Sequence, residues 1–114
     1  MHELALAGAL LDALRDSADE RGIRRIGRVR VVMGALSCAD PRALHFAFDV
    51  LKTQDDRTEA AQLEIEVEPA RARCRHCRHE FTASWWQYRC PQCQQFGVEL
   101  EGSDEIRLDW YEGE

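Results

Sequence analysis

The sequence has no uninterrupted apolar run of the length needed to cross a bilayer. It also lacks the pattern of a secretory signal, because Asp12, Arg15 and Asp16 break up its N-terminal hydrophobic residues. We therefore expect a cytoplasmic protein that does not act on a membrane. Cysteines stay reduced in the cytoplasm, so paired cysteines in this chain indicate metal binding rather than disulfide bonds.

Residue groups typical of an enzyme are also missing. The sequence has no glycine-rich phosphate loop and no obvious pair of acids in a pocket. It offers no cysteine and histidine accompanied by a third residue to orient them. These absences favour a binding protein over an enzyme.

Length and composition are those of one globular domain with room for a small module: 114 residues, 45% hydrophobic and 32% charged. The net charge of −6 is unevenly distributed. Residues 70–95 contain five arginines and one glutamate, whereas residues 96–114 contain one arginine and seven acids. An acidic protein binds phosphate backbones poorly, so we expect no nucleic-acid partner. The basic segment keeps a zinc-ribbon adaptor or nucleic-acid-binding module open as the alternative function.

Hydrophobic periodicity predicts two helices. The first covers residues 3–21 and ends before Gly22, and its apolar residues recur at spacings of three and four. This apolar stripe consists of Leu4, Ala7, Leu11, Leu14 and Ala18. The second helix begins at Pro41, a favoured first helical residue. Its predicted buried stripe consists of Leu44, Ala47, Phe48 and Leu51.

Alternating apolar and polar residues predict the strands. Residues 24–34 place Val29, Val31 and Met33 on one face, and residues 62–69 place Leu63, Ile65 and Val67 inward. Residues 98–110 are typical of a hairpin around Gly102 and Ser103. We expect an α+β fold in which two helices pack on a small mixed sheet of about three strands. Residues 70–95 form an inserted zinc-ribbon module, so the main domain comprises residues 1–69 and 96–114.

Four cysteines carry the strongest chemical signal. Cys74 and Cys77 form one Cys-x2-Cys pair, and Cys90 and Cys93 form a second after a gap of 12 residues. Each pair brings two thiolates to one metal ion, and two pairs complete a tetrahedron that suits Zn²⁺. Because the protein supplies all four ligands, we expect a structural zinc site. An iron site with the same ligands is the alternative.

The other cysteine and three of the histidines are expected to have ordinary roles. Cys38 is predicted to be a small buried apolar residue, and His45 a partly buried residue of the second helix. His76 and His79 flank the first cysteine pair, and we interpret both as exposed loop residues. The open alternative is that one of them replaces or supports a thiolate ligand.

The opening residues "MHE" contain a second candidate metal site. A free α-amine, the backbone nitrogen of residue 2 and the imidazole of His2 can bind one ion in two fused chelate rings. Deprotonated amide nitrogen and imidazole suit Ni²⁺ or Cu²⁺. Only a histidine at position 2 can supply this set of donors.

Four anchors in the same order resemble the HypA/HybF family of nickel metallochaperones. They are "MHELAL", "GALSCADPRALHFAF" at 34–48, the two cysteine pairs, and "GSDEIRL" at 102–108. The resemblance implies a nickel-binding α/β domain joined to a zinc domain. It implies delivery of Ni²⁺ during maturation of nickel–iron hydrogenase, with the GTPase HypB and the hydrogenase large subunit as partners. In some organisms such proteins also serve urease.

The same resemblance suggests roles for individual residues. It implies that His2 binds nickel with contributions from Met1 and Glu3, and that the four cysteines bind zinc. Asp40 is a further candidate nickel ligand, but an aspartate directly before a helix is also a standard N-cap. Glu3 would equally stabilise the positive end of the first helix. The sequence leaves open whether the chain forms a weak homodimer.

Overall fold

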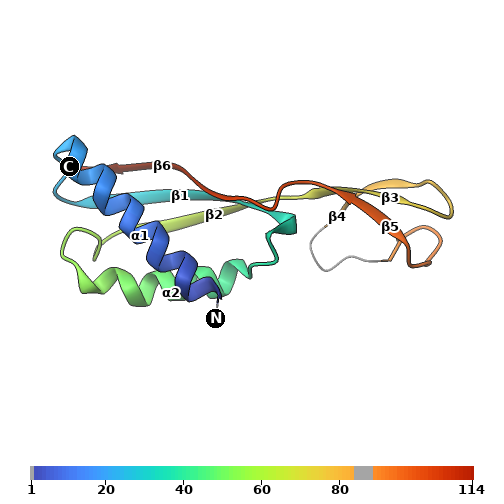
Figure 1. Cartoon of the computed structure of the whole chain (residues 1–114), viewed down its shortest axis with the longest axis horizontal. Coiled ribbons are helices and arrows are strands. Elements are labelled where there is room, and N and C mark those ends of the chain that lie inside the picture. The colour runs from blue at the N-terminus through green and yellow to red at the C-terminus, as the bar shows by residue number, and fades with distance from the viewer. Residues whose placement is uncertain (1, 84–88) are drawn as a thin grey trace. The chain divides into compact units, whose positions relative to one another are not determined.

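The structure is a computed structural model that describes residues 2–83 and 89–114. Its elements follow the order helix, strand, helix, then strands to the C-terminal end (Figure 1). They are α1 (His2–Arg21), β1 (Ile26–Gly34), η1 (Ala35–Ser37), α2 (Pro41–Leu51), η2 (Lys52–Gln54), β2 (Gln62–Glu68), β3 (Ala70–Cys74), β4 (Glu80–Ala83), β5 (Val98–Glu101) and β6 (Ile106–Gly113). The predicted α+β fold is confirmed. No helix among these residues is long and apolar enough to cross a membrane.

The described residues form two compact units. The first contains the residues up to Val32 together with 39–66 and 107–114. The second contains residues 33–38 and 67–106. The first unit thus holds both α-helices, and the second holds the four paired cysteines.

Helix α1 agrees closely with its prediction. Four of its five predicted core residues, Ala7, Leu11, Leu14 and Ala18, are buried. Leu4 is 44% exposed, so its prediction as a core residue is wrong: it lies in the first turn, ahead of the buried stripe. Gly22 ends the helix with φ +69°, a left-handed conformation that glycine adopts without strain.

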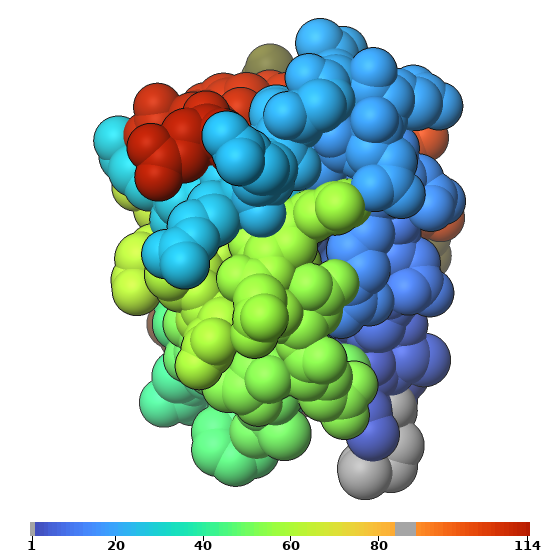
Figure 2. Space-filling model, turned by 90° about the vertical axis from the view of Figure 1, so that its left-hand side faces the viewer, coloured from blue at the N-terminus to red at the C-terminus, as the bar shows by residue number. Residues whose placement is uncertain are grey.

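Helix α2 starts as predicted at a capped proline. The Asp40 side chain accepts a hydrogen bond from the Arg42 backbone N–H at 2.9 Å, and Pro41 occupies the first turn. Leu44, Ala47 and Phe48 are buried as predicted. The two helices pack against each other. Figure 2 shows α1 in blue beside the green segment that contains the end of α2.

The first sheet has the strand order β2-β1-β6. Strand β1 is buried at Ile26 and Val29 and then continuously from Val31 to Gly34. Arg28 on its other face pairs with Glu64 of β2 at 2.6 Å and with Glu112 of β6 at 3.4 Å. In β2, burial decreases along the strand from Leu63 to Ile65 to Val67, which is 38% exposed rather than buried as predicted. One face of the sheet thus supports the helices, and cross-strand ion pairs cover the other.

The second sheet has the order β4-β3-β5, and both pairings are antiparallel. The predicted hairpin over residues 98–110 is wrong, because β5 pairs with β3 whereas β6 pairs with β1. Between β5 and β6 the chain runs beside the end of β1: the Leu36 N–H donates to Ser103 O at 3.0 Å, and the Gly34 N–H to Glu105 O at 2.8 Å. Strand alternation predicts that a segment is extended, but it does not specify the partner strand.

Candidate functional site

The four paired cysteines converge at one point of the second unit. Their sulfur atoms all lie within 4.8 Å of one another. The Sγ atoms of Cys74 and Cys93 are 3.5 Å apart, and those of Cys77 and Cys90 are 3.6 Å apart. Each close contact therefore joins a thiol of one pair to a thiol of the other, as a shared metal ion requires.

The two cysteine pairs have the same backbone conformation. The Arg78 N–H donates to Cys74 O at 3.0 Å, and the Gln94 N–H donates to Cys90 O at 2.9 Å. Both donors have a positive φ, 63° at Arg78 and 67° at Gln94. Each turn is also closed by an N–H of its first cysteine, which donates at 3.0 Å to the carbonyl five residues later. The two Cys-x2-Cys pairs therefore form matching turns.

Backbone N–H groups inside the first turn point at sulfur. The N–H of Cys77 and that of His76 donate to Cys74 Sγ at 3.5 and 3.4 Å. Mainly because of the Cys77 bond, the pKa of Cys74 is lowered to about 6. At Cys93 the Gln95 N–H lowers the pKa, but burial and the neighbouring thiols outweigh it and raise the pKa to about 12. A cation that binds all four thiolates displaces these protons, so metal binding weakens in acid.

The donor set fits a zinc ion. Ligands about 2.3 Å from a tetrahedral Zn²⁺ place sulfur atoms roughly 3.8 Å apart, close to the two contacts between the pairs. Cys74 and Cys90 are buried, whereas Cys77 is exposed and Cys93 partly so. Four soft thiolates leave no position for water or substrate on a tetrahedral ion, which is the pattern of a structural site. An iron ion accepts the same four donors.

The nearby histidines are engaged elsewhere. The Nε2 atom of His76 lies 3.0 Å from Phe96 O. The ring of His79 stacks on Phe81, with centroids 5.7 Å apart. Neither joins the cluster of potential metal ligands found among residues 2–83 and 89–114. These contacts favour the interpretation that both histidines are loop residues.

The N-terminal candidates lie at the start of α1. His2 is exposed in the first turn, and Met1 lies outside the described residues. The Asp40 backbone N–H donates to Glu3 Oε2 at 3.1 Å. This bond is the largest cause that lowers the pKa of Glu3 below 4.5. The structure thus brings Glu3 and Asp40 together across 37 residues of sequence.

The two roles considered for Asp40, helix cap and nickel ligand, can be filled by different oxygens of its carboxylate. Oδ1 of its carboxylate accepts the Arg42 N–H, so the capping role is confirmed. A metal ion can bind through the second oxygen without breaking the cap. The sequence did not predict the hydrogen bond between Glu3 and Asp40. Each residue already had a local explanation, Glu3 as an acid in the first turn of a helix and Asp40 as a helix cap.

Cys38 and His45 complete the predicted residues. Cys38 is exposed, so its predicted burial is wrong. It follows η1 in a left-handed conformation with φ 61°, at the end of a turn rather than inside an element. His45 lies on α2 as predicted, with 46% of its side chain exposed and both ring nitrogens in polar contacts.

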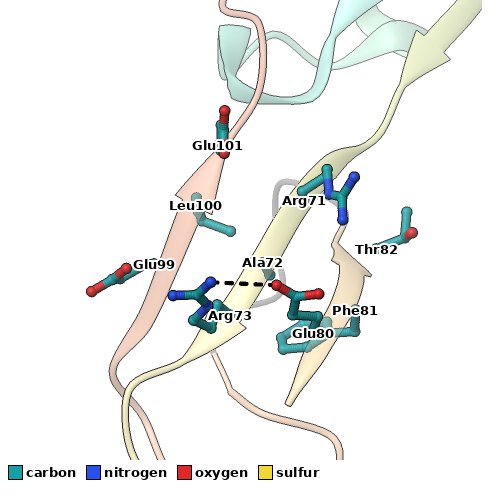
Figure 3. Close-up of a pocket in the computed structure, with 9 residues that line it drawn as sticks. All are labelled: Arg71, Ala72, Arg73, Glu80, Phe81, Thr82, Glu99, Leu100 and Glu101. Atoms are coloured by element: carbon teal, nitrogen blue, oxygen red, sulfur yellow. Dashed lines mark hydrogen bonds and ion pairs between the residues drawn. The ribbon is translucent and has the colours of Figure 1, made fainter. Parts of the chain in front are cut away.

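The polar face of the second sheet is hollowed, with a cavity of about 740 Å³ (Figure 3). Arg71 and Arg73 lie on the central strand, with Glu80 on one neighbouring strand and Glu99 and Glu101 on the other. Arg73 pairs with Glu80 at 3.5 Å. Charges of both signs alternate across the strands, so the hollow does not form a site for an ion of one sign.

The comparisons with known proteins agree with one another on the family that this chain resembles. The family described as hydrogenase/urease nickel incorporation, metallochaperone, hypA matches residues 1–113. The chain is 44% identical to hydrogenase maturation factor HypA of Moorella thermoacetica, over the full length of both chains. It is 34% identical to hydrogenase maturation factor HybF of Morganella morganii, again over both full lengths. The solution structure of the Ni metallochaperone HypA from Helicobacter pylori has the same fold, with 24% identity and a TM-score of 0.66 over 97% of this chain and 96% of that chain.

Proposed function

Since the chain belongs to the HypA family of nickel metallochaperones and hydrogenase maturation factors, we propose that it binds Ni²⁺ at its N-terminus and delivers it to hydrogenase. The observation that carries this proposal is the full-length family match together with a histidine at position 2. His2 supplies an imidazole and a backbone nitrogen beside the α-amine of Met1. These nitrogen donors suit Ni²⁺.

The proposed nickel site comprises His2, Met1, Glu3 and Asp40. The hydrogen bond from the Asp40 N–H to Glu3 supports this grouping, because it holds the start of α1 beside the N-cap of α2. Oxygen donors from either carboxylate can complete the coordination of the ion. Glu3 already accepts a hydrogen bond, so its first role in this proposal is to position the terminus.

Zinc has a different role in the proposal. Cys74, Cys77, Cys90 and Cys93 hold a structural Zn²⁺ in a domain of residues 70–95, and the nickel-binding domain comprises residues 1–69 and 96–114. The converging sulfurs and the matching turns support the zinc assignment. A segment with so few large apolar residues depends on its metal for folding.

Transfer of the cargo follows from the position of the nickel site. His2 is exposed at the chain end, where an acceptor can replace the ligands one at a time. We propose that the GTPase HypB and the hydrogenase large subunit are the partners, in the cytoplasm, and that urease is a second recipient in organisms that make it. The protein itself catalyses no reaction in this scheme.

The structure weakens the case for the alternative function, a nucleic-acid-binding module. It depended on the arginines of residues 70–95. Arg73 pairs with Glu80, and Arg75 pairs with Glu99 at 3.4 Å. Internal pairing leaves these guanidinium groups less available to phosphates.

A calorimetric titration with Ni²⁺ tests the proposal, using the untagged zinc-loaded protein and the His2→Ala variant. We expect His2→Ala to bind nickel at least about 100-fold more weakly while keeping its zinc. His45→Gln is the matched control, because it removes another exposed imidazole, on α2. Equal nickel binding by wild type and His2→Ala contradicts the proposed site.

A further inference from the structure

A hollow of about 350 Å³ lies beside β6 in the first unit. The side chains of two of its lining residues diverge: the guanidinium group of Arg28 lies 5.3 Å from the ring centroid of Trp110, whereas the Tyr111 hydroxyl lies 2.6 Å from Ser17 Oγ of α1. Adjacent side chains of a strand point to opposite faces of the sheet. A hollow that touches both residues therefore follows the edge of the strand. Its lining consists of Arg21, Ile23, Leu108, Asp109, Trp110 and Tyr111.

This edge of β6 is open to a further strand. Strand β6 stands at the end of the order β2-β1-β6, so β1 is its one neighbour among the described strands (Figure 1). Hydrogen bonds at the two ends of β6 fix this pairing: the Gly34 N–H donates to Glu105 O, and the Glu114 N–H to Arg25 O, each at 2.8 Å. The opposite edge faces outward. An extended peptide can pair with such an edge through its main chain, and side-chain pockets beside the edge then select its sequence.

Three arginines stand next to the open edge. Arg21 lines the hollow, and Arg24 and Arg25 line a second one of about 380 Å³ together with Glu114. All three are exposed, and none forms an ion pair within the described part of the chain. Figure 2 shows this end of the first unit, where the light-blue residues that follow α1 lie against the red end of β6.

Most acids of β6 are already engaged on the side of β1. Asp109 pairs with Arg30 at 3.3 Å, and Glu112 pairs with Arg28 at 3.4 Å. Among the described residues that line the two hollows, Glu114 is then the one acid without an ion pair. Three unpaired arginines thus face one unpaired acid, and the edge attracts carboxylates.

We infer that the open edge of β6 is a docking site for an extended acidic segment of a partner protein. The segment adds to the sheet as a strand, and its carboxylates pair with Arg21, Arg24 and Arg25. An apolar side chain of the segment enters the hollow beside Ile23 and Leu108. Because the net charge of −6 repels polyanions that bind by charge alone, main-chain pairing has to accompany the arginine contacts. This inference is independent of nickel binding.

An NMR titration of the ¹⁵N-labelled, zinc-loaded protein tests the inference. The probe is an eight-residue peptide in which valine and glutamate alternate. One control peptide has lysine in place of glutamate, and the other has methylated amide nitrogens, which cannot donate to a strand. We expect the glutamate peptide to shift the amides of residues 21–25 and 107–113, and both controls to bind at least about tenfold more weakly. Equal binding of the three peptides, or shifts confined to other residues, would overturn the inference.

A pair of arginine variants separates the site from general charge. Arg24→Gln/Arg25→Gln removes two positive charges beside the edge, and Arg42→Gln/Arg71→Gln removes two from exposed arginines on α2 and β3. The net charge of both variants is the same. The glutamate peptide should bind the first variant about tenfold more weakly than wild type, and the second with less than about a twofold change. Equal losses in the two variants would show a general charge effect and refute the site.

A second copy of this chain is the other occupant that an open edge admits. Sedimentation velocity of the zinc-loaded protein, at the concentration used for NMR, distinguishes the two. The inference predicts a monomer that the glutamate peptide saturates. A dimer whose dissociation by the peptide shifts the amides of residues 107–113 would assign the edge to self-association and overturn the inference.

Discussion

The carboxylate of Glu3 accepts a hydrogen bond from the backbone N–H of Asp40 at 3.1 Å, and Asp40 in turn caps α2. The first turn of α1 is thereby tied to the beginning of α2. A metal ligand at position 2 directly precedes Glu3 and therefore lies next to this contact. This contact can be tested apart from nickel, because it acts through the charge of one partly buried carboxylate.

The first prediction concerns Glu3. Since its folded pKa is lowered, mainly by the Asp40 N–H, the ionised form stabilises the fold above pH 4.5. That stabilisation is lost as the pH falls through the lowered value. Glu3→Ala should therefore have a lower Tm than wild type at neutral pH, and the gap should shrink below pH 4.5. Asp16→Ala, which removes an exposed acid of the same helix, should show no comparable pH-dependent gap.

The second prediction separates the two roles of Asp40. Asp40→Ala removes the cap and should destabilise the protein by about 1 kcal/mol in denaturant titrations. Asp40→Asn keeps an oxygen that can accept the Arg42 N–H, so its stability should remain close to that of wild type. If Asp40 is also a nickel ligand, Asp40→Asn should bind Ni²⁺ more weakly at unchanged stability. Unchanged nickel binding in Asp40→Asn would leave Asp40 as a cap only.

The third prediction concerns the zinc ligands. Cys90→Ser should reduce the zinc content from about one ion per chain to nearly none, because three thiolates leave the tetrahedron open. Cys38→Ser is the matched control, since this exposed thiol stands outside the cluster and its loss should leave the zinc content unchanged. Metal analysis after dialysis measures both. Retention of a full zinc ion by Cys90→Ser would contradict the site.

The fourth prediction tests the packing of the end of β1 against Ser103, in the segment between β5 and β6. A Cβ placed at Gly34 would lie 2.1 Å from the backbone oxygen of Ser103. Gly34→Ala should therefore destabilise the protein by about 3 kcal/mol, because backbone must move. Gly8→Ala in α1 meets nothing within 4 Å and should stabilise the protein by roughly 0.5–1 kcal/mol. Destabilisation of the two variants by equal amounts would contradict this packing.

Local patterns predicted the helices and most strands well. Spacings of three and four predicted α1 and four of its five expected buried residues correctly, and the Asp40 cap indicated the start of α2. These features are set by neighbouring residues, which a sequence displays directly. The cysteine pairs were equally accessible, since the turn geometry of Cys-x2-Cys follows from its spacing.

Features that depend on distant residues were not predictable in the same way. The segment after β5 has the alternation of a hairpin, but hydrogen bonds of Ser103 and Glu105 with the end of β1 and with η1 direct it to another sheet. Cys38 has an ordinary sequence context, and its exposure follows from the turn that it ends. The bond between Glu3 and Asp40 likewise arises only when α1 and α2 pack together.

The central claim is that Ni²⁺ binds at the free amino terminus, so the most direct measurement displaces that amine. A variant with three extra glycines before Met1 moves His2 to the fifth position, too far from the new amine for the two to share fused chelate rings, and leaves every other residue unchanged. Calorimetric titration of this zinc-loaded variant should show nickel affinity reduced by at least about 100-fold, with zinc content equal to that of wild type. The same three glycines added after Glu114 are the control and should change neither the nickel affinity nor the zinc content. Full nickel affinity in the N-terminally extended protein would contradict the account.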